Sequence, residues 1–359
     1  MSLAIVPSAA VDGVEARSAQ VEVDVSQGLP GFTIVGLADK AVEESRERVR
    51  SAIKNIGFKF PLSRITVHLA PSDSKKTGLH FDLPITLGIL LADAQLETLS
   101  DRNETLFIGG ISLDGNLQPI QGTLVLVEWV KNNKFKNVVL PGQNLSEAKL
   151  VEGINVIGVE HFNQVLEWCR GEFSGLPATT RSNQSATSID LDWLQIQGQQ
   201  QAKRAAVIAA AGAHNLLLEG PPGAGKTLLA RGLRALLPPL NQDELIEVIK
   251  LHSIAGELDR NPSVDSIHRP FRSPHHTSSQ IALVGGGSTP KPGEISLAHR
   301  GVLFLDEIPE FPRSVVEALR QPLEDGRINV SRASQSLSFP AQFQLVATMN
   351  PFPCGLINS

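Results

Sequence analysis

A glycine-rich stretch near the middle of the chain has the composition and spacing of a phosphate-binding loop. It reads Gly220-Pro221-Pro222-Gly223-Ala224-Gly225-Lys226-Thr227 and fits the pattern G-x-x-x-x-G-K-[ST] at every fixed position. Backbone N–H groups of such a loop surround a polyphosphate, and glycines allow the chain to approach closely. We expect Lys226 to contact the β- and γ-phosphates and Thr227 to ligate Mg²⁺. Leu228, in the helix that starts at Lys226 and turns its N-terminus to the anion, completes the predicted nucleotide site.

Two further strand ends carry side chains that suit triphosphate hydrolysis. The apolar run 302–305 ends in Asp306 and Glu307, and the run 345–348 is followed shortly by Asn350. We expect Asp306 to hold Mg²⁺ through water and Glu307 to orient or deprotonate the water that attacks the γ-phosphate. Asn350 is expected to hydrogen-bond that water and the phosphate. Asp-Glu alone also occurs in solvated loops, but the three elements in this order indicate a nucleoside triphosphatase.

The phosphate loop, the Asp306-Glu307 strand end and Asn350 resemble Walker A, Walker B and sensor 1 of the AAA+ ATPases. From Gly198 to Gly355 the sequence is similar to the magnesium-chelatase-like branch of that class, and within it to the ComM/YifB family. The resembling stretches are 209–218, 269–276, 292–299 and 319–324. The resemblance implies ATP and Mg²⁺ as cofactors, a parallel sheet flanked by helices with an insertion in the second helix, and a homo-hexameric ring.

Length predicts a protein of two domains, and the alternation of strand-like and helical stretches predicts the α/β class. The chain has 359 residues and a net charge of −5, and its two cysteines, Cys169 and Cys354, form no ligand pattern. No apolar window reaches the ~18 residues that a membrane helix needs, and the first residues lack the basic start of a secretion signal. We therefore expect a cytoplasmic protein without membrane contact, in which any nucleic-acid contact comes from a local patch.

Residues 1–173 alternate strand-like and helical stretches, which predicts a mixed α/β domain with a helix over 40–56. Pro71 to Asp82 resembles the segment of Lon-type proteases that carries their serine nucleophile, which implies the Lon-protease fold, similar to ribosomal protein S5. His80 stands at the position of that serine, and Val125-Leu126 stand about where the partner lysine belongs. Without nucleophile and base there is no acyl-enzyme chemistry, so we expect a scaffold or binding platform.

Residues 174–189 are rich in Ser, Gly, Pro, Thr, Asn and Gln, which predicts a linker before an ATPase core at 190–359. The resemblance implies that full-length relatives continue beyond this core into an arginine finger, a helical lid and sensor 2. An arginine supplied across a subunit interface can contribute ~10³–10⁵ in turnover. We expect nucleotide binding without them, with hydrolysis and ring formation impaired. The departure of 352–359 from the family pattern, beginning at Phe352, is consistent with a truncated or frameshifted product.

More than 70 residues separate the phosphate loop from the Asp306 strand, more than one crossover helix needs. Between residues 267 and 300 four cations accompany a single acidic residue, Glu294. These cations are Arg269, Arg272, Lys291 and Arg300. A surface hairpin with ordinary charges explains such a window. The resemblance implies instead an insertion that projects toward the pore of a ring, so we expect the four cations to contact the phosphate backbone of DNA.

The leading interpretation is therefore an ATP-dependent motor that acts on single-stranded or branched DNA, similar to ComM-like helicases of branch migration in transformation and recombination. A chelatase-type motor that remodels a protein partner for insertion of Mg²⁺ into a porphyrin is the first alternative. A nucleotide-binding fragment without turnover is the second. The Lon-like N-terminal domain favours the DNA motor.

Overall fold

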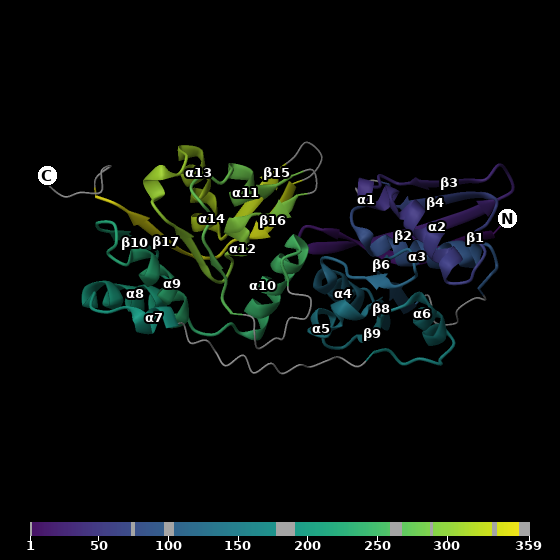
Figure 1. Cartoon of the computed structure of the whole chain (residues 1–359), viewed down its shortest axis with the longest axis horizontal. Coiled ribbons are helices and arrows are strands. Elements are labelled where there is room, and N and C mark those ends of the chain that lie inside the picture. Colours follow the sequence, from purple (N-terminus) through teal and green to yellow (C-terminus); the bar gives the residue numbers. More distant parts are fainter. Residues whose placement is uncertain are drawn as a thin grey trace. The chain divides into compact units, whose positions relative to one another are not determined.

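The computed structural model describes residues 2–72, 76–96, 104–176, 191–258, 268–287, 290–331 and 336–351. The chain forms two compact units (Figure 1): Met1–Arg181 with Gly256–Pro262, and Ser182–Ala255 with Ser263–Ser359. Both are α/β, as expected from the sequence. Most of the predicted linker 174–189, as well as Cys354 and the segment 352–359, lies outside the described residues.

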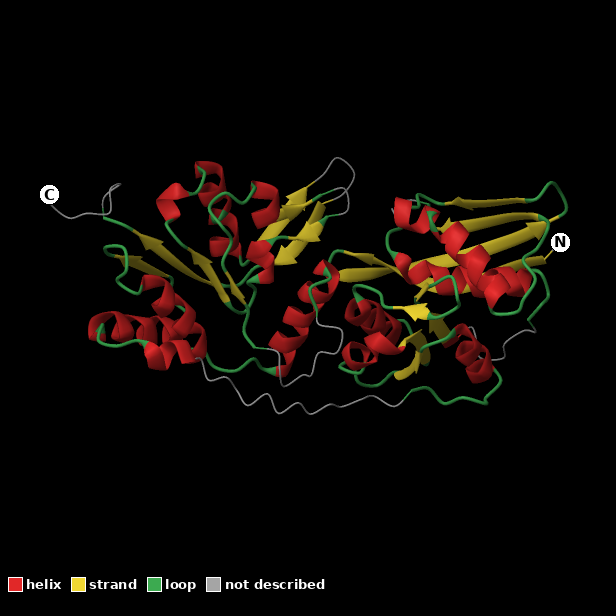
Figure 2. Cartoon of the chain, viewed as in Figure 1, coloured by secondary structure: helices red, strands yellow, loops and turns green. Residues whose placement is uncertain are grey.

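The N-terminal unit is built on a four-stranded sheet in the order β1-β2-β4-β3 (Figure 2). Its strands are β1 (Ser2–Asp12), β2 (Glu15–Ser26), β3 (Gly31–Val35) and β4 (Arg64–Ala70). β1, β2 and β4 pair antiparallel, whereas β3 is an edge strand parallel to β4. Along β2 and β4 alternate side chains are buried, because successive residues of a strand point to opposite faces and one face packs on helices.

Helices cover that face of the sheet. They are α1 (Lys40–Glu43), α2 (Ser45–Asn55) and α3 (Asp82–Ala92), the last preceded by the 3₁₀ turn η1 (Leu79–Phe81). α2 buries Val49, Ala52 and Ile53, which keep to one stripe at helical spacing. The single helix expected over 40–56 is thus two helices, interrupted at Glu44.

A second, parallel sheet completes this unit in the order β5-β8-β9. Its strands are β5 (Thr105–Phe107), β8 (Asn137–Pro141) and β9 (Asn155–Val159). It is accompanied by β6 (Gly110–Ile111), β7 (Leu117–Gln118), α4 (Thr123–Asn132), η3 (Gly142–Asn144), α5 (Leu145–Ala148) and α6 (Phe162–Cys169). The buried apolar side chains of this unit gather in two clusters, one between the first sheet and its helices and one around α4.

The second unit is organised by a parallel sheet in the order β10-β17-β14-β11. These strands are β10 (Leu216–Glu219), β11 (Phe271–Arg272), β14 (Val302–Leu305) and β17 (Gln344–Met349). Helices α7 (Leu191–Gln195), α8 (Gln200–Gly212) and α9 (Lys226–Leu236) pack together beside it. α9 buries Leu229, Ala230 and Leu233 in one cluster with Phe304 and Val346 of the central strands.

The segment between β10 and β17 supplies the remaining elements. These are α10 (Gln242–Ala255), α11 (Gln280–Val284), β12 (Gly285–Gly286), β13 (Lys291–Pro292), α12 (Glu294–Leu297), η5 (Ile308–Glu310), α13 (Arg313–Ala318), α14 (Arg320–Asp325), β15 (Arg327–Ser331) and β16 (Ser336–Pro340). β15 and β16 form an antiparallel hairpin. Within the described ranges, no helix has both the length and the apolar character needed to cross a membrane.

Candidate active site

The phosphate loop connects the end of β10 to the start of α9. Gly220 N–H donates to the Met349 carbonyl at 3.3 Å, which ties the beginning of the loop to the tip of β17. Gly223 and Gly225 have φ of 79° and 81°, in the left-handed region that glycine adopts without steric cost. Because α9 starts directly after Gly225, its first N–H groups point toward the concave side of the loop. This is the arrangement that binds phosphate at a helix N-terminus.

The Lys226 ammonium joins the loop to the neighbouring strand. Its Nζ donates to the carbonyl oxygens of Gly220 at 2.5 Å and Pro221 at 3.1 Å, and to Asn350 Oδ1 at 2.8 Å. The charge therefore lies between the loop and the tip of β17. A phosphate oxygen bound there would be a stronger partner than a carbonyl, because it adds the attraction between opposite charges to the hydrogen bond.

The two strand ends are connected by a chain of hydrogen bonds. The Thr348 hydroxyl donates to Asp306 Oδ1 at 2.5 Å and accepts the Glu307 N–H at 2.8 Å. Asn350 Nδ2 donates to Glu307 Oε1 at 3.0 Å. The Thr227 hydroxyl lies 3.4 Å from Asp306 Oδ2. All the predicted hydrolytic side chains thus lie within one network.

Strand order explains why these side chains meet. β17 lies between β10 and β14, and the register pairs Leu305 with Ala347. The next residue pair along the strands is Asp306 and Thr348, and Asn350 then lies beside both the phosphate loop and Glu307. Glu307 itself has a φ of 55°, a left-handed conformation that is uncommon outside glycine and often marks functional sites.

The oxygen atoms of Thr227 and Asp306 fit a magnesium ion. Mg²⁺ prefers oxygen ligands and usually binds through one or two protein groups, several waters and the phosphates of a nucleotide. In the part of the chain that the structure describes, no group of three or more His, Cys, Asp or Glu side chains could hold a metal by itself. This donor set therefore suits an ion that arrives with a triphosphate.

Comparisons with known proteins agree with this geometry. Residues 192–359 match the family model described as magnesium chelatase, subunit ChlI, and residues 21–144 match the model described as subunit ChlI of Mg-chelatase. Over 99% of its length the chain is 48% identical to the competence protein ComM of Haemophilus influenzae, covering 70% of that protein. It is 43% identical to YifB of Escherichia coli, covering 69%. The chain belongs to the ComM/YifB group of the magnesium-chelatase-like family.

This family assignment makes the second unit an AAA+ core, as the resemblance implied. The magnesium-chelatase 67 kDa subunit of Heliobacterium mobile is more distant, at 30% identity over 45% of this chain and 28% of that protein. Within the AAA+ core, sequence reasoning did not identify Thr348. The only signal for it was its position two residues before Asn350, which places it opposite Asp306 once the strands are paired.

Three of the four cations assigned to DNA are held by carboxylates within the AAA+ core. Arg269 donates to Glu244 Oε2 at 3.0 Å and to the Arg300 carbonyl at 2.6 Å. Arg272 forms a two-pronged ion pair with Glu294, at 2.6 and 2.7 Å. The contact of these cations with DNA stays a prediction, because their guanidinium groups already have strong partners.

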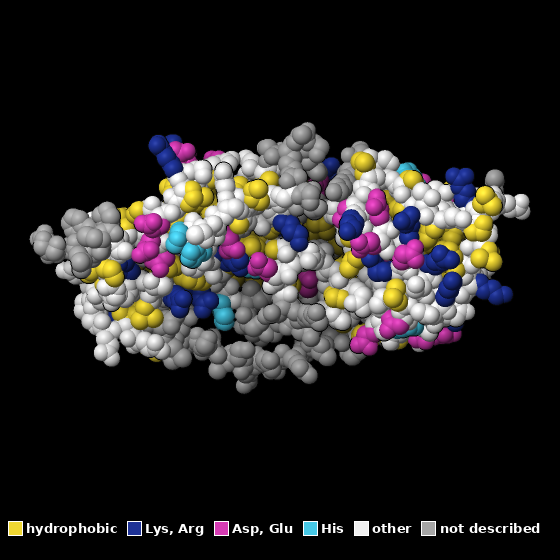
Figure 3. Space-filling model, turned by 45° about the horizontal axis from the view of Figure 1, so that its top comes forward, with side chains coloured by type: hydrophobic (Ala, Val, Ile, Leu, Met, Phe, Trp, Pro, Cys, Tyr) yellow, Lys and Arg dark blue, Asp and Glu magenta, His cyan; other side chains and the backbone are white. Residues whose placement is uncertain are grey.

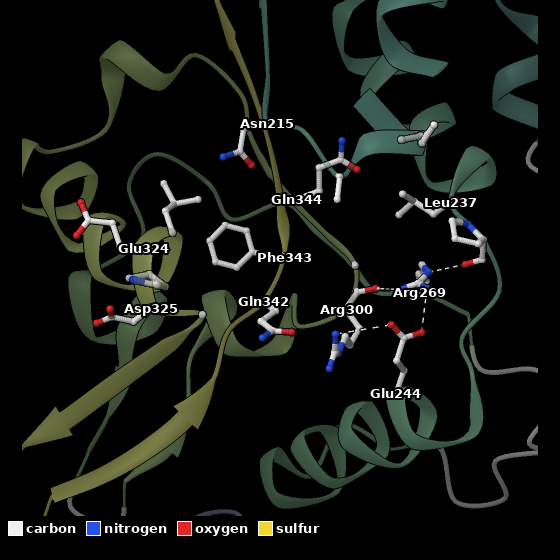
Figure 4. A pocket seen from close by; sticks show the side chains of 18 residues that line it. Asn215, Leu237, Glu244, Arg269, Arg300, Glu324, Asp325, Gln342, Phe343 and Gln344 are labelled. Atoms are coloured by element: carbon white, nitrogen blue, oxygen red, sulfur yellow. Dashed lines mark hydrogen bonds and ion pairs between the residues drawn. The ribbon is translucent and has the colours of Figure 1, made fainter. Parts of the chain in front are cut away.

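Arg300 binds two acidic residues of α10. Its Nε donates to Glu247 Oε2 at 2.8 Å. Its Nη1 lies 3.7 Å from Glu244 Oε1, a contact that Figure 4 shows. Burial raises the pKa of Glu247, but the hydrogen bonds from Arg300 and His299 outweigh it and hold that pKa below its ordinary value. The net positive charge of residues 267–300 was counted without α10, so it did not include Glu244 and Glu247, which neutralise two of the arginines. The remaining cation, Lys291, is exposed on β13.

Arg269 and Arg300 line a cavity of about 590 Å³ at the opposite edge of the sheet from the phosphate loop. Its lining includes Asn215, Gly301 and Phe343, which directly precede β10, β14 and β17. The predicted nucleotide site lies at the carboxyl ends of the same strands. These ion pairs therefore stabilise the far side of the AAA+ core and do not contact the nucleotide site.

The N-terminal unit has no nucleophile or base at the positions that correspond to the Lon-type dyad. His80 is 3% exposed, its Nε2 is buried without a hydrogen-bond partner, and burial lowers its pKa to about 4. Val125 and Leu126 are buried in α4. Nearby, burial raises the pKa of Asp82, which accepts hydrogen bonds from Arg48. Buried aliphatic side chains of α4 and the ion pair between Arg48 and Asp82 therefore lie where a Lon-type dyad was considered.

Proposed function

We propose that this chain is an ATP hydrolase whose turnover drives movement along single-stranded or branched DNA. The observation that carries the ATPase part is the connected network of Lys226, Asn350, Glu307, Thr348 and Asp306. DNA as the polymer is supported by the name of the relative at 48% identity, a competence protein, since competence is the capacity of a cell to take up DNA.

In this proposal each side chain of the network has one task. Lys226 moves from its loop carbonyls to the transferring phosphate and stabilises the charge that develops there. Glu307 accepts a proton from the attacking water, and Asn350, which donates to Glu307 Oε1, fixes the direction of that carboxylate. Thr348 fixes Asp306 and the Glu307 backbone together. Thr227 and Asp306 would hold Mg²⁺, which would neutralise negative charge on the triphosphate.

Steady-state ATP hydrolysis tests the proposal. Turnover is measured for the chain and for Glu307→Gln, with no DNA, with single-stranded DNA and with forked DNA. Glu310→Gln is the matched control, because it removes an exposed carboxylate three residues away that makes no contact with the network. We expect DNA to stimulate turnover, Glu307→Gln to abolish it and Glu310→Gln to leave it unchanged. An ATP turnover rate that DNA does not change would contradict the DNA-motor part of the proposal. ATP binding without any hydrolysis would contradict the ATP-hydrolase part.

A chelatase-type motor is the second candidate, and a specific observation favours it. Both family models are described by a subunit of magnesium chelatase, and a magnesium-chelatase subunit is among the relatives. Such a motor would remodel a protein partner for insertion of Mg²⁺ into a porphyrin. ATP turnover that is unaffected by DNA and rises with a protein partner would favour this candidate over the first.

We further propose that the chain associates with itself into a hexameric ring in the presence of Mg²⁺ and ATP, as AAA+ membership suggests. Light scattering during size-exclusion chromatography of Glu307→Gln, which should bind ATP without consuming it, measures the assembled mass. A mass that stays that of one chain at all nucleotide concentrations would exclude the ring for this chain.

A further inference from the structure

The N-terminal unit carries a small surface cavity that the ATPase mechanism does not use. Its volume is about 270 Å³, and it lies where the start of β3, the helix α2 and the loop between α2 and β4 meet. Its lining includes Phe32, Phe60 and Leu62, two basic residues, Arg46 and Arg50, and one acidic residue, Glu47. On the face of this unit shown in Figure 3, Lys and Arg side chains lie among hydrophobic and acidic ones.

Two aromatic rings form the apolar part of this cavity. Phe32 and Phe60 have ring centroids 5.9 Å apart and planes inclined by 42°. Both are half-buried and pack against the core of the unit, so each retains an accessible part. The adjacent Leu62 and Leu29 are 85% and 90% exposed. The accessible apolar surface around the two rings therefore extends to these leucines.

Two arginines of α2 line the cavity beside the rings. Arg46 and Arg50 stand one turn apart, and the Arg50 guanidinium lies 5.7 Å from the centroid of Phe60. Among the described residues neither arginine forms an ion pair, in contrast to Arg269, Arg272 and Arg300 of the AAA+ core. Residues 45–64 contain six basic residues and one acidic residue, Glu47.

The loop that carries Phe60 is fixed in position. Gln95 accepts the Lys59 N–H at 3.0 Å and donates to the Lys59 carbonyl at 2.6 Å, so one side chain binds both backbone groups. Gly31 N–H donates to the Ser63 carbonyl at 3.3 Å, which joins the loop to β3. A surface ordered before binding loses less conformational entropy when a ligand arrives.

We propose that this surface binds single-stranded nucleic acid. A base stacks on Phe60 and Phe32, and Arg46 and Arg50 contact the neighbouring phosphates. Aromatic faces beside arginines are the combination that binds single strands without sequence preference. A duplex keeps its bases stacked inside, and an acidic peptide would engage the arginines and leave the rings unused. The inference extends the proposed function, because it gives the N-terminal unit a DNA contact separate from the nucleotide site.

Fluorescence anisotropy with a short labelled oligo-dT tests this on the full chain without nucleotide, over a series of salt concentrations. Phe60→Leu keeps the apolar contact and removes the stacking face, so we expect affinity to fall about tenfold with the salt slope unchanged. The double variant Arg46→Gln, Arg50→Gln should weaken binding and lower the slope of log K against log salt by about 1.4, since a phosphate contact on a single strand contributes about 0.7. Arg170→Gln, exposed in the same unit and outside the cavity, is the matched control.

Three further measurements separate the outcomes. Phe60→Trp preserves a stacking face, so retained binding by this variant shows that a loss in Phe60→Leu comes from stacking and not from unfolding. Equal affinity for an abasic strand of the same length overturns the proposal and makes the surface a site for anions in general, including acidic proteins. If the double arginine variant binds as the wild type while DNA still stimulates ATP turnover, this inference fails and the motor proposal stands.

Discussion

At the scale of single residues, Thr348 connects Asp306, the predicted metal ligand, to Glu307, the predicted base. Thr348→Val keeps the side-chain shape and removes the hydroxyl that binds both Asp306 and the Glu307 N–H. We expect ATP turnover to fall about 10- to 100-fold, the usual cost of losing a group that orients a metal ligand, while ATP affinity changes little. Thr348→Ser retains the hydroxyl and should retain turnover. A valine variant with wild-type turnover would show that Thr348 has no orienting role.

His80 should make the N-terminal unit sensitive to acid. Its pKa is lowered from 6.5 to about 4 by burial, so the unfolded chain binds a proton at a higher pH than the folded one does. The stability from keeping His80 neutral is fully present above pH 6.5 and is lost as the pH falls toward 4. The free energy of unfolding falls by about 3 kcal/mol in total, because each unit of pKa shift corresponds to about 1.36 kcal/mol.

Urea unfolding of wild type and His80→Phe between pH 7 and 4.5 measures this effect. Phenylalanine places another flat aromatic ring at this position and cannot take up a proton, so the variant should lose less stability on acidification. Taking the difference between the two proteins cancels the contribution of Asp82, whose pKa is raised by burial. His68→Gln, at a half-exposed position in the same unit, is the control. Parallel pH profiles for wild type and His80→Phe would contradict the prediction.

The motif residues of the site could be predicted because their spacing along the chain is itself the signal. Gly220 to Thr227 form one continuous segment from the phosphate loop into the start of α9. Asp306, Glu307 and Asn350 each follow an apolar strand, so the local sequence identifies them as well. Thr348 could not be identified this way, since its role depends on the register between β14 and β17.

At the scale of elements, helix α10 changes the interpretation of the arginines in the insertion. Glu244 of α10 and the carbonyls of Pro238 and Arg300 all accept from Arg269, whose side chain is 14% exposed. We expect Arg269→Gln to lower the free energy of unfolding of the AAA+ core by about 2 kcal/mol, because it breaks a partly buried ion pair and leaves partly buried acceptors without donors. Chemical unfolding followed by circular dichroism measures the change.

Lys291→Gln is the comparison for this prediction. It removes one positive charge from an exposed position on β13, and exposed substitutions usually change stability by less than about 0.5 kcal/mol. If Arg269→Gln keeps full stability and loses DNA affinity, the arginine contacts DNA, as the sequence suggested. If it loses stability and the remaining folded protein binds DNA normally, its role is structural.

Helices and strands with strong periodicity were predictable, whereas their interruptions and partners were not. Residues 313–325 form two helices, α13 and α14, and not one, because Pro322 lacks an N–H and its ring would clash with the carbonyl four residues before it. That proline was visible in the sequence and its effect could have been anticipated. β1 was not anticipated, since its residues show no clear alternation and it exists through pairing with β2 along its whole length.

At the scale of the whole molecule, each unit has its own buried apolar clusters. The nucleotide network lies entirely in the second unit, so MgATP should stabilise that unit alone. At a ligand concentration 100 times Kd the gain is about 2.7 kcal/mol. The three tryptophans report on the units separately, with Trp129 and Trp168 in the first and Trp193 in the second.

Thermal unfolding of single-tryptophan variants, with and without MgATP, measures this. The transition seen by Trp193 should move to higher temperature, and those seen by Trp129 and Trp168 should stay in place. Lys226→Ala removes the ammonium that meets the phosphates and should abolish the shift, while Arg170→Gln in the first unit should leave it intact. Equal shifts at all three tryptophans would mean that the two units unfold together, so that nucleotide binding also stabilises the unit that contains Phe60.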